Sequence, residues 1–288
     1  MYTYKLDKLP KTTYEFQVDI PWADVEKEYE KAFNRLHEEF VFEGYRKGKA
    51  PKSIAQQHIK KDAIFQHAIR SFVPDIYEEI IKKETIKPIV NPKVELIEAK
   101  EKEDWKIKIT VAERPEIILE TYKKAVHDAL AESKTPEIWT PGQGEKPAES
   151  KETTDQNKLN IVLDALMKDI KIDIADLIVE DELNQRLSKL VDDVQKVGLT
   201  MESYLTSKGL TMETMKSQLT KEIEDTYKLE FILMAIADKE NIVVEQKDLE
   251  ALFANIKDEK ERQNAVRNAY FYASIMKKQK TLEFLTSL

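Results

Sequence analysis

The chain has 288 residues, which is room for about two domains. It carries 54 acidic and 46 basic side chains, a formal net charge of −8, and 35% of its residues are charged. The absence of cysteine excludes disulfides and thiolate metal sites, and the four histidines show no metal-ligand spacing. No apolar run approaches the length of about 18 residues that a membrane span needs, and the N-terminus lacks the apolar stretch of a signal peptide. These features predict a cytoplasmic protein without a membrane partner.

Composition divides the chain into two parts. All ten prolines lie at or before Pro147. Residues 1–115 hold 22 Lys/Arg and 21 Asp/Glu, a net charge of +1, so the remainder carries −9. This asymmetry indicates that the two parts face different surroundings.

The first part, residues 1–115, is predicted to be an α+β domain. Apolar and polar residues alternate over 13–20 and again over 105–111, which is typical of half-buried strands. A third strand is expected over 93–99. Apolar residues recur every three or four positions over 22–40 and 64–81, which predicts two helices. Pro74 is expected to kink or break the second of these helices near Val73.

Residues 44–51, between the two helices, read Gly-Tyr-Arg-Lys-Gly-Lys-Ala-Pro. From Arg46 through Lys61 there are six Lys/Arg and no acidic residue. Glycine lets a backbone approach a ligand closely, arginine pairs with phosphate in bidentate fashion, and lysine adds point charges. Taken by itself, the loop is typical of a solvated turn, the usual meaning of Gly, Pro and Lys together. The alternative, which this chemistry offers, is a phosphate-binding surface.

Residues 116–157 are predicted to be a short helix, 120–133, followed by a linker without apolar pattern. Trp139 in this linker has no explanation from composition.

From residue 158 to 288 the pattern predicts an all-α domain. Helices are expected over 183–197, 211–238, 245–256 and 258–284. The pentapeptide Gly-Leu-Thr-Met-Glu occurs at 198–202 and again at 209–213, which we interpret as a C-cap glycine followed by a threonine N-cap. The last helix is apolar almost all round, which favours a buried core helix. The alternative is an adaptable apolar surface rich in methionine and aromatic residues.

The order of a small sheet, long helices and the 44–51 loop resembles the ribosome-binding domain of the bacterial trigger factor family. The family's loop reads Gly-Phe-Arg-x-Gly-Lys-x-Pro, and here Tyr45 replaces the usual Phe and Ala50 the usual Val. The helical part resembles the family's substrate-cradling domain. The isomerase domain that usually lies between the two, about a hundred residues, has no room in 116–157.

The resemblance implies an ATP-independent chaperone that binds the large ribosomal subunit beside the exit tunnel and holds nascent or unfolded polypeptides. Because the isomerase domain is missing, we do not expect the family's enzymatic activity, and we expect no cofactor or metal. We find no catalytic motif and no helix suited to DNA. The sequence leaves a weak homodimer open. The alternative function is a ribosome-independent holdase or assembly factor. The expected ribosome contacts are Gly44, Tyr45, Arg46, Lys47, Gly48 and Lys49. The expected client contacts are Met201, Tyr204, Met215, Tyr270, Phe271 and Met276.

Overall fold

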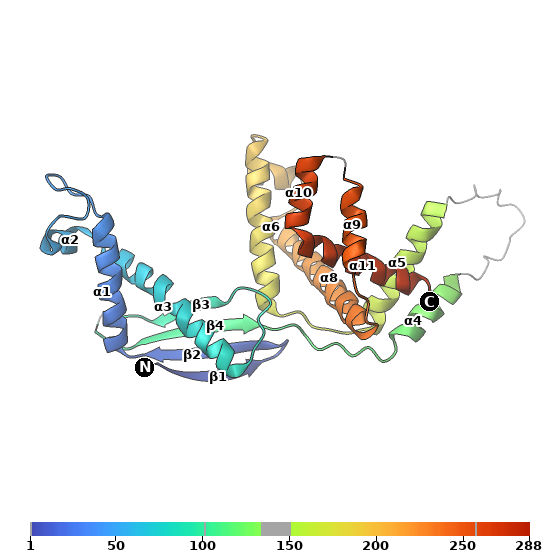
Figure 1. The fold of residues 1–288 in the computed structure, drawn as a ribbon, viewed down its shortest axis with the longest axis horizontal. Coiled ribbons are helices and arrows are strands. Elements are labelled where there is room, and N and C mark those ends of the chain that lie inside the picture. Colours follow the sequence, from blue (N-terminus) through green and yellow to red (C-terminus); the bar gives the residue numbers. More distant parts are fainter. Residues whose placement is uncertain (1, 101, 134–150, 257) are drawn as a thin grey trace, which may run out of the picture. The chain divides into compact units, whose positions relative to one another are not determined.

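The computed structural model describes residues 2–100, 102–133, 151–256 and 258–288 (Figure 1). The chain forms two compact units. Unit 1 comprises Met1–Arg114 and Ala175–Glu180, and unit 2 comprises Pro115–Ile174 and Asp181–Leu288. An antiparallel sheet with helices occupies the first unit, and the described residues of the second form helices alone, which confirms the predicted fold class. No helix in the described ranges has the length and hydropathy needed to cross a membrane.

Unit 1 is built on a four-stranded antiparallel sheet in the order β1-β2-β4-β3. Its elements are β1 (Thr3–Leu9), β2 (Thr13–Ile20), α1 (Trp22–Glu39), α2 (Lys52–His58), α3 (Lys61–Glu84), β3 (Lys93–Glu98) and β4 (Trp105–Ala112). The strand β1 was not predicted. Tyr4 and Leu6 alternate with polar residues there, but Lys8 interrupts the pattern.

One face of this sheet carries the core of unit 1. The central strands place Phe16 opposite Ile109 and Val18 opposite Ile107, and all four side chains are completely buried. Helices α1 and α3 cover this face with further buried apolar side chains, among them Val25, Phe33, Ile64, Phe72 and Ile80. The half-buried strands predicted from alternation are therefore present because one face of each packs against these helices.

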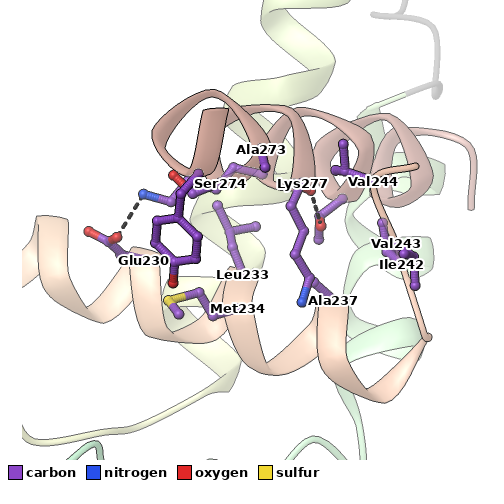
Figure 2. Close-up of a pocket in the computed structure, with 13 residues that line it drawn as sticks. Glu230, Leu233, Met234, Ala237, Ile242, Val243, Val244, Ala273, Ser274 and Lys277 are labelled. Carbon is purple, nitrogen blue, oxygen red and sulfur yellow. Dashed lines mark hydrogen bonds and ion pairs between the residues drawn. The ribbon is translucent and has the colours of Figure 1, made fainter. Parts of the chain in front are cut away.

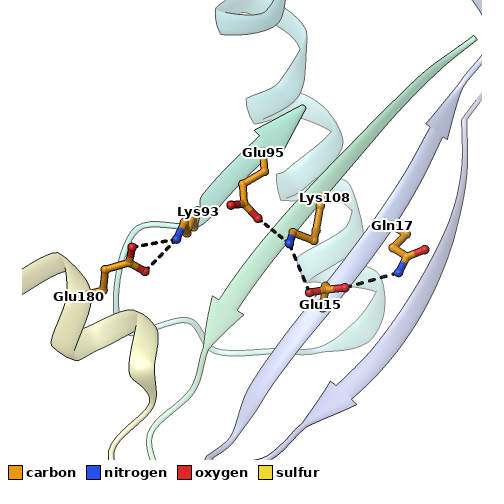
Figure 3. Close-up of polar contacts among 6 residues, drawn as sticks. All are labelled: Glu15, Gln17, Lys93, Glu95, Lys108 and Glu180. Atoms are coloured by element: carbon orange, nitrogen blue, oxygen red, sulfur yellow. Dashed lines mark hydrogen bonds and ion pairs between the residues drawn. The ribbon is translucent and has the colours of Figure 1, made fainter. Parts of the chain in front are cut away.

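The opposite face of the sheet is ionic (Figure 3). Lys108 Nζ lies 2.6 Å from a carboxylate oxygen of Glu95 and 3.9 Å from one of Glu15. The hydrogen bond to Lys108 lowers the pKa of Glu95. Lys93 donates to both carboxylate oxygens of Glu180 at 2.8 and 2.9 Å. Glu180 lies at the start of helix α6 (Asp176–Lys196), and this pair holds the start of that helix within unit 1. These pairs are only partly buried and contribute little each to stability.

Helix α3 continues through Pro74, so the predicted break is wrong. Proline removes the hydrogen bond to the carbonyl of Arg70 and crowds that turn. Buried residues lie on both sides of the proline, with Phe72 and Val73 before it and Ile76 after it. We attribute the unbroken helix to this packing, which offsets the free-energy cost of placing a proline inside the helix.

Unit 2 is all-helical in the described residues. Its helices are α4 (Tyr122–Ser133), α5 (Lys151–Asp169), α6 (Asp176–Lys196, whose first turn belongs to unit 1), α7 (Met201–Lys208), α8 (Met212–Lys239), α9 (Gln246–Ala254), α10 (Glu259–Arg267) and α11 (Ala269–Thr286). Helix α5 begins inside the expected linker, at Lys151, and Trp139 lies outside the described residues. The single helix expected over 258–284 is two helices that meet at Asn268.

The repeated pentapeptide has the predicted capping role. Gly198 and Gly209 have φ angles of +77° and +64°, the left-handed conformation of a residue that ends a helix. Thr200 and Thr211 accept hydrogen bonds from the backbone N–H three residues later, as N-caps do.

Helix α4 is fastened to the end of α8 by a polar cluster. The buried Tyr122 donates a 2.6 Å hydrogen bond to Glu240, and Lys123 Nζ lies 2.8 Å from the same carboxylate. The Lys123 ammonium, followed by the Tyr122 hydroxyl, lowers the pKa of Glu240. Burial, followed by the hydrogen bond to Glu240, raises the pKa of Tyr122. Residues 116–133, expected to belong to a connecting segment, thus pack within the helical unit.

Candidate functional site

The basic loop connects the end of α1 to the start of α2 and is closed by backbone hydrogen bonds. Gly48 N–H donates to the Phe40 carbonyl at 2.9 Å, and Lys49 N–H donates to the Arg46 carbonyl at the same distance. Tyr45 N–H donates to the Phe42 carbonyl at 3.1 Å. The loop is therefore a set of tight turns with a defined backbone.

Glycine is required at the two loop positions for different structural reasons. Both have positive φ angles, +85° at Gly44 and +70° at Gly48. A Cβ added at Gly48 would lie 2.6 Å from the carbonyl oxygen of Glu38, in the last turn of α1. A Cβ at Gly44 meets no described atom within 4 Å. Gly48 is thus required for both backbone conformation and close approach, and Gly44 for conformation alone.

His37 joins the two ends of the loop. Its Nε2 lies 2.6 Å from the carbonyl oxygen of Ala50, so the ring nitrogen donates this bond. The ring also stacks on Phe33 with centroids 6.0 Å apart. Ala50 is buried at the base of the loop. These contacts hold the loop's end against α1.

Aromatic side chains within the loop and in α2 pack against one another. Phe42 lies with its ring centroid 4.7 Å from that of His58 and 6.4 Å from that of Tyr45. Phe40 stacks on Phe42 at 6.1 Å. Tyr45 is 43% exposed, so part of its ring is free to contact a partner.

The three cations of the loop face solvent. Arg46, Lys47 and Lys49 are exposed, and within the part of the chain that the structure describes they form no ion pair and no side-chain hydrogen bond. Lys52, in the first turn of α2, donates instead to Asn34 of α1 at 2.9 Å. Three cations on a well-defined loop, with no ion pair to any described residue, can bind an anionic surface without first breaking such a pair.

Replacing His37 by alanine is expected to loosen the loop without unfolding unit 1. One hydrogen bond contributes about 1 kcal/mol, so the population of open loop should rise roughly fivefold. The measurement is the initial rate of trypsin cleavage after Arg46, Lys47 and Lys49, with the cut sites identified by mass spectrometry. His37→Gln, which keeps a donor, is the matched control. Equal cleavage rates for wild type and His37→Ala would contradict this role.

A second candidate site is an apolar cleft of about 530 Å³ inside unit 2 (Figure 2). Helix α8 forms one wall with Leu233, Met234 and Ala237, and α11 forms another with Ala273 and Ser274. The segment 242–244, Ile-Val-Val, lies at one end of the cleft. Two ion pairs lie at its edge: Lys278 with Glu230 and Lys277 with Asp238, each 2.7 Å long.

The predicted client contacts do not form one surface. Tyr270 lines the cleft and is 90% exposed, and Phe271, on the same helix, is 59% exposed. Met276 is half-buried on α11, as are Met201 and Tyr204 on α7. Met215 is buried in unit 2, so its expected role in a client surface is not supported by its position.

The preferred interpretation of the last helix as a core helix is wrong for its first half. Tyr270, Phe271 and Ile275 are exposed, while Thr281 and Leu285 in the second half are buried. An apolar stripe identifies a core helix only where a neighbouring element covers it, and the first half of α11 borders the cleft instead.

Sequence reasoning missed several residues of both sites. His37, Phe42 and His58 were not assigned to the loop, and an aromatic or histidine just before and after a glycine-rich turn is the signal that could have found them. The segment 242–244 was not assigned to a client surface. Its signal is a β-branched run between two predicted helices, where no strand partner is available.

Comparisons with known proteins agree with this two-part architecture. The family model described as bacterial trigger factor protein matches residues 2–138, and the model described as bacterial trigger factor protein C-terminus matches residues 144–285. Only residues 139–143 lie between the two matched ranges.

Individual relatives match over part of the chain. The trigger factor of Moorella thermoacetica is 32% identical over 117 residues, which are 41% of this chain and 26% of the relative. The trigger factor of Staphylococcus aureus strain JH9 is 34% identical over 106 residues, 37% of this chain and 24% of the relative. The chain thus matches about a quarter of the length of these curated relatives.

A solved structure has the same fold over nearly the whole chain. It comes from work on promiscuous substrate recognition in the folding and assembly activities of the trigger factor chaperone. It aligns with a TM-score of 0.61 at 13% identity and covers 98% of this chain and 99% of that one. The fold and the loop define an α+β domain with an exposed basic turn, joined to a helical domain with an apolar cleft. With both family models matched, the chain belongs to the trigger factor family.

Proposed function

We propose that this protein is an ATP-independent chaperone of the cytoplasm that binds the large ribosomal subunit through the loop 44–51. Unit 2 then holds nascent or unfolded polypeptides on its apolar helical surface. The observation that carries the proposal is the loop itself, whose three cations have no ion-pair partner among the described residues and are held on a backbone that Gly48 and His37 fix. Family membership supports the choice of the ribosome as the anionic partner.

The same proposal includes the absence of enzymatic activity. The ranges matched by the two family models leave residues 139–143 between them, whereas a separate isomerase domain would take about a hundred residues. The chaperone domains are proposed as 1–115 and 158–288, joined by residues 116–157, whose described part packs with the helical unit. A weak homodimer of the free protein is compatible with this proposal.

Reversing the charge of Arg46 and Lys47 to glutamate is expected to abolish co-sedimentation with ribosomes at moderate salt. Each lost cation should make the dependence of log affinity on log salt less steep by about 1, because fewer counterions are released on binding. The variant should keep its ability to suppress aggregation of a denatured protein, since unit 2 is unchanged.

The matched control is the pair Arg70→Glu and Lys87→Glu, which makes the same charge change at two exposed positions of unit 1 outside the loop. If both double variants co-sediment like wild type, ribosome binding by the loop is refuted. The ribosome-independent holdase would then be the better description, because aggregation suppression without ribosome binding is what it predicts.

A further inference from the structure

The extended segment beside the cleft has unused backbone hydrogen-bonding groups. Ile242 N–H donates to the Ala237 carbonyl at 2.8 Å, which anchors the segment to the end of α8. The N–H groups of Val243 and Val244 and the carbonyl of Val243 have no hydrogen-bond partner among the described residues. Val243 is 67% exposed, so these groups are open to a partner from outside.

The residue types of this segment favour a strand. Ile242, Val243 and Val244 are all β-branched, and such residues are enriched in strands. The segment follows helix α8 and precedes α9, and unit 2 has no strand within its described part. A strand-forming segment is thus present without a strand to pair with.

The cleft next to the segment is apolar and nearly neutral. The two lysines at its edge are already paired, Lys278 with Glu230 and Lys277 with Asp238. An acidic or basic ligand would have to compete with these pairs, whereas an uncharged apolar chain would not. Tyr270 adds an exposed aromatic ring to the cleft, which suits apolar side chains of varied shape.

We propose that unit 2 binds an extended apolar stretch of an unfolded polypeptide as an added strand along the segment 242–244, paired through the N–H and the carbonyl of Val243, which point to the same edge. Backbone hydrogen bonds to Val243 give affinity that does not depend on the client's sequence, and alternate client side chains enter the cleft. This inference rests on the proposed chaperone function and names how the client is held: by its backbone as well as by its apolar side chains.

The test measures peptide binding by the full chain with one backbone donor removed. Val243→Pro deletes the N–H at that position, and Val243→Thr is the matched control that keeps the N–H and the β-branch. The probe is a fluorescein-labelled peptide of about twelve residues in which leucine alternates with serine, and binding is followed by fluorescence anisotropy. We expect roughly tenfold weaker binding for Val243→Pro and less than about twofold for Val243→Thr.

Two further arms make the result decisive. A peptide methylated on alternate backbone nitrogens should bind wild type roughly tenfold more weakly, because it cannot donate to the segment. Met234→Glu, which places a charge in the cleft, should also weaken binding of the unmodified peptide. Circular dichroism spectra and melting temperatures show whether each variant is folded, and a variant that is not folded is replaced by the methylated-peptide arm.

Each outcome has a clear meaning. Equal affinities of wild type, Val243→Pro and the methylated peptide overturn strand addition while leaving the chaperone function intact. A peptide that does not bind, together with no suppression of aggregation of a denatured protein, overturns the chaperone function itself. If the peptide's apparent affinity falls as the chain associates with itself, and Val243→Pro abolishes that association in sedimentation velocity, the segment is a contact between two copies and the proposal is wrong.

Discussion

Replacing Gly48 by alanine should weaken the proposed ribosome binding by the loop well over tenfold. The new Cβ would lie 2.6 Å from the Glu38 carbonyl oxygen, which is a backbone atom of α1 and has little freedom to move. The residue would also have to keep a φ of +70°, which is unfavourable for alanine. The Gly48 N–H to Phe40 bond is expected to break, and the loop cations then lose their common orientation.

Gly44→Ala is the matched control for this prediction. It introduces the same side chain at a similar φ, but its Cβ meets no described atom within 4 Å. We expect the ribosome affinity of Gly44→Ala to fall only several-fold, in line with a strain of about 1 kcal/mol, and that of Gly48→Ala to fall well over tenfold. Co-sedimentation over a range of ribosome concentrations measures both. Equal effects of the two substitutions would show that close packing at Gly48 is unimportant.

Replacing Trp105 by alanine should destabilise unit 1 by about 3–5 kcal/mol, the usual range for removing a buried aromatic. The side chain is 1% exposed at the start of β4, with ring centroids 5.3 Å from Phe65 and 6.3 Å from Phe72. Its indole N–H also donates to the Lys100 carbonyl at 3.1 Å. Since whole domains are stable by about 5–15 kcal/mol, this loss leaves unit 1 marginal.

Urea unfolding followed by far-ultraviolet circular dichroism measures this loss, and hydrogen exchange locates it in unit 1. Trp105→Phe should cost much less because most of the buried ring area remains. Trp22→Ala, at a half-buried position of α1, provides a second comparison. A loss below about 1 kcal/mol for Trp105→Ala would contradict the packing described here, since that is the range of surface substitutions.

Local sequence patterns predicted the strands and helix ends that are set by residues close to one another in the sequence. The strands β2 and β4 follow from alternation along the chain, and the helix ends at Gly198 and Gly209 follow from capping chemistry. The loop 44–51 was found from its glycines and charges alone. By contrast, the continuity of α3 through Pro74 depends on buried neighbours from other elements, which no local rule includes.

The sequence by itself determined the fold class, because strand alternation and helix capping are properties of neighbouring residues, and its basic turn carried the resemblance to the family. Only the tertiary structure decided which glycine is sterically required, since Glu38 approaches Gly48 through the folding of the loop back on α1. It also decided that the apolar first half of α11 borders a cleft and that the 242–244 backbone has no strand partner among the described residues. Exposure depends on which elements pack together, and residues far apart in sequence set that packing.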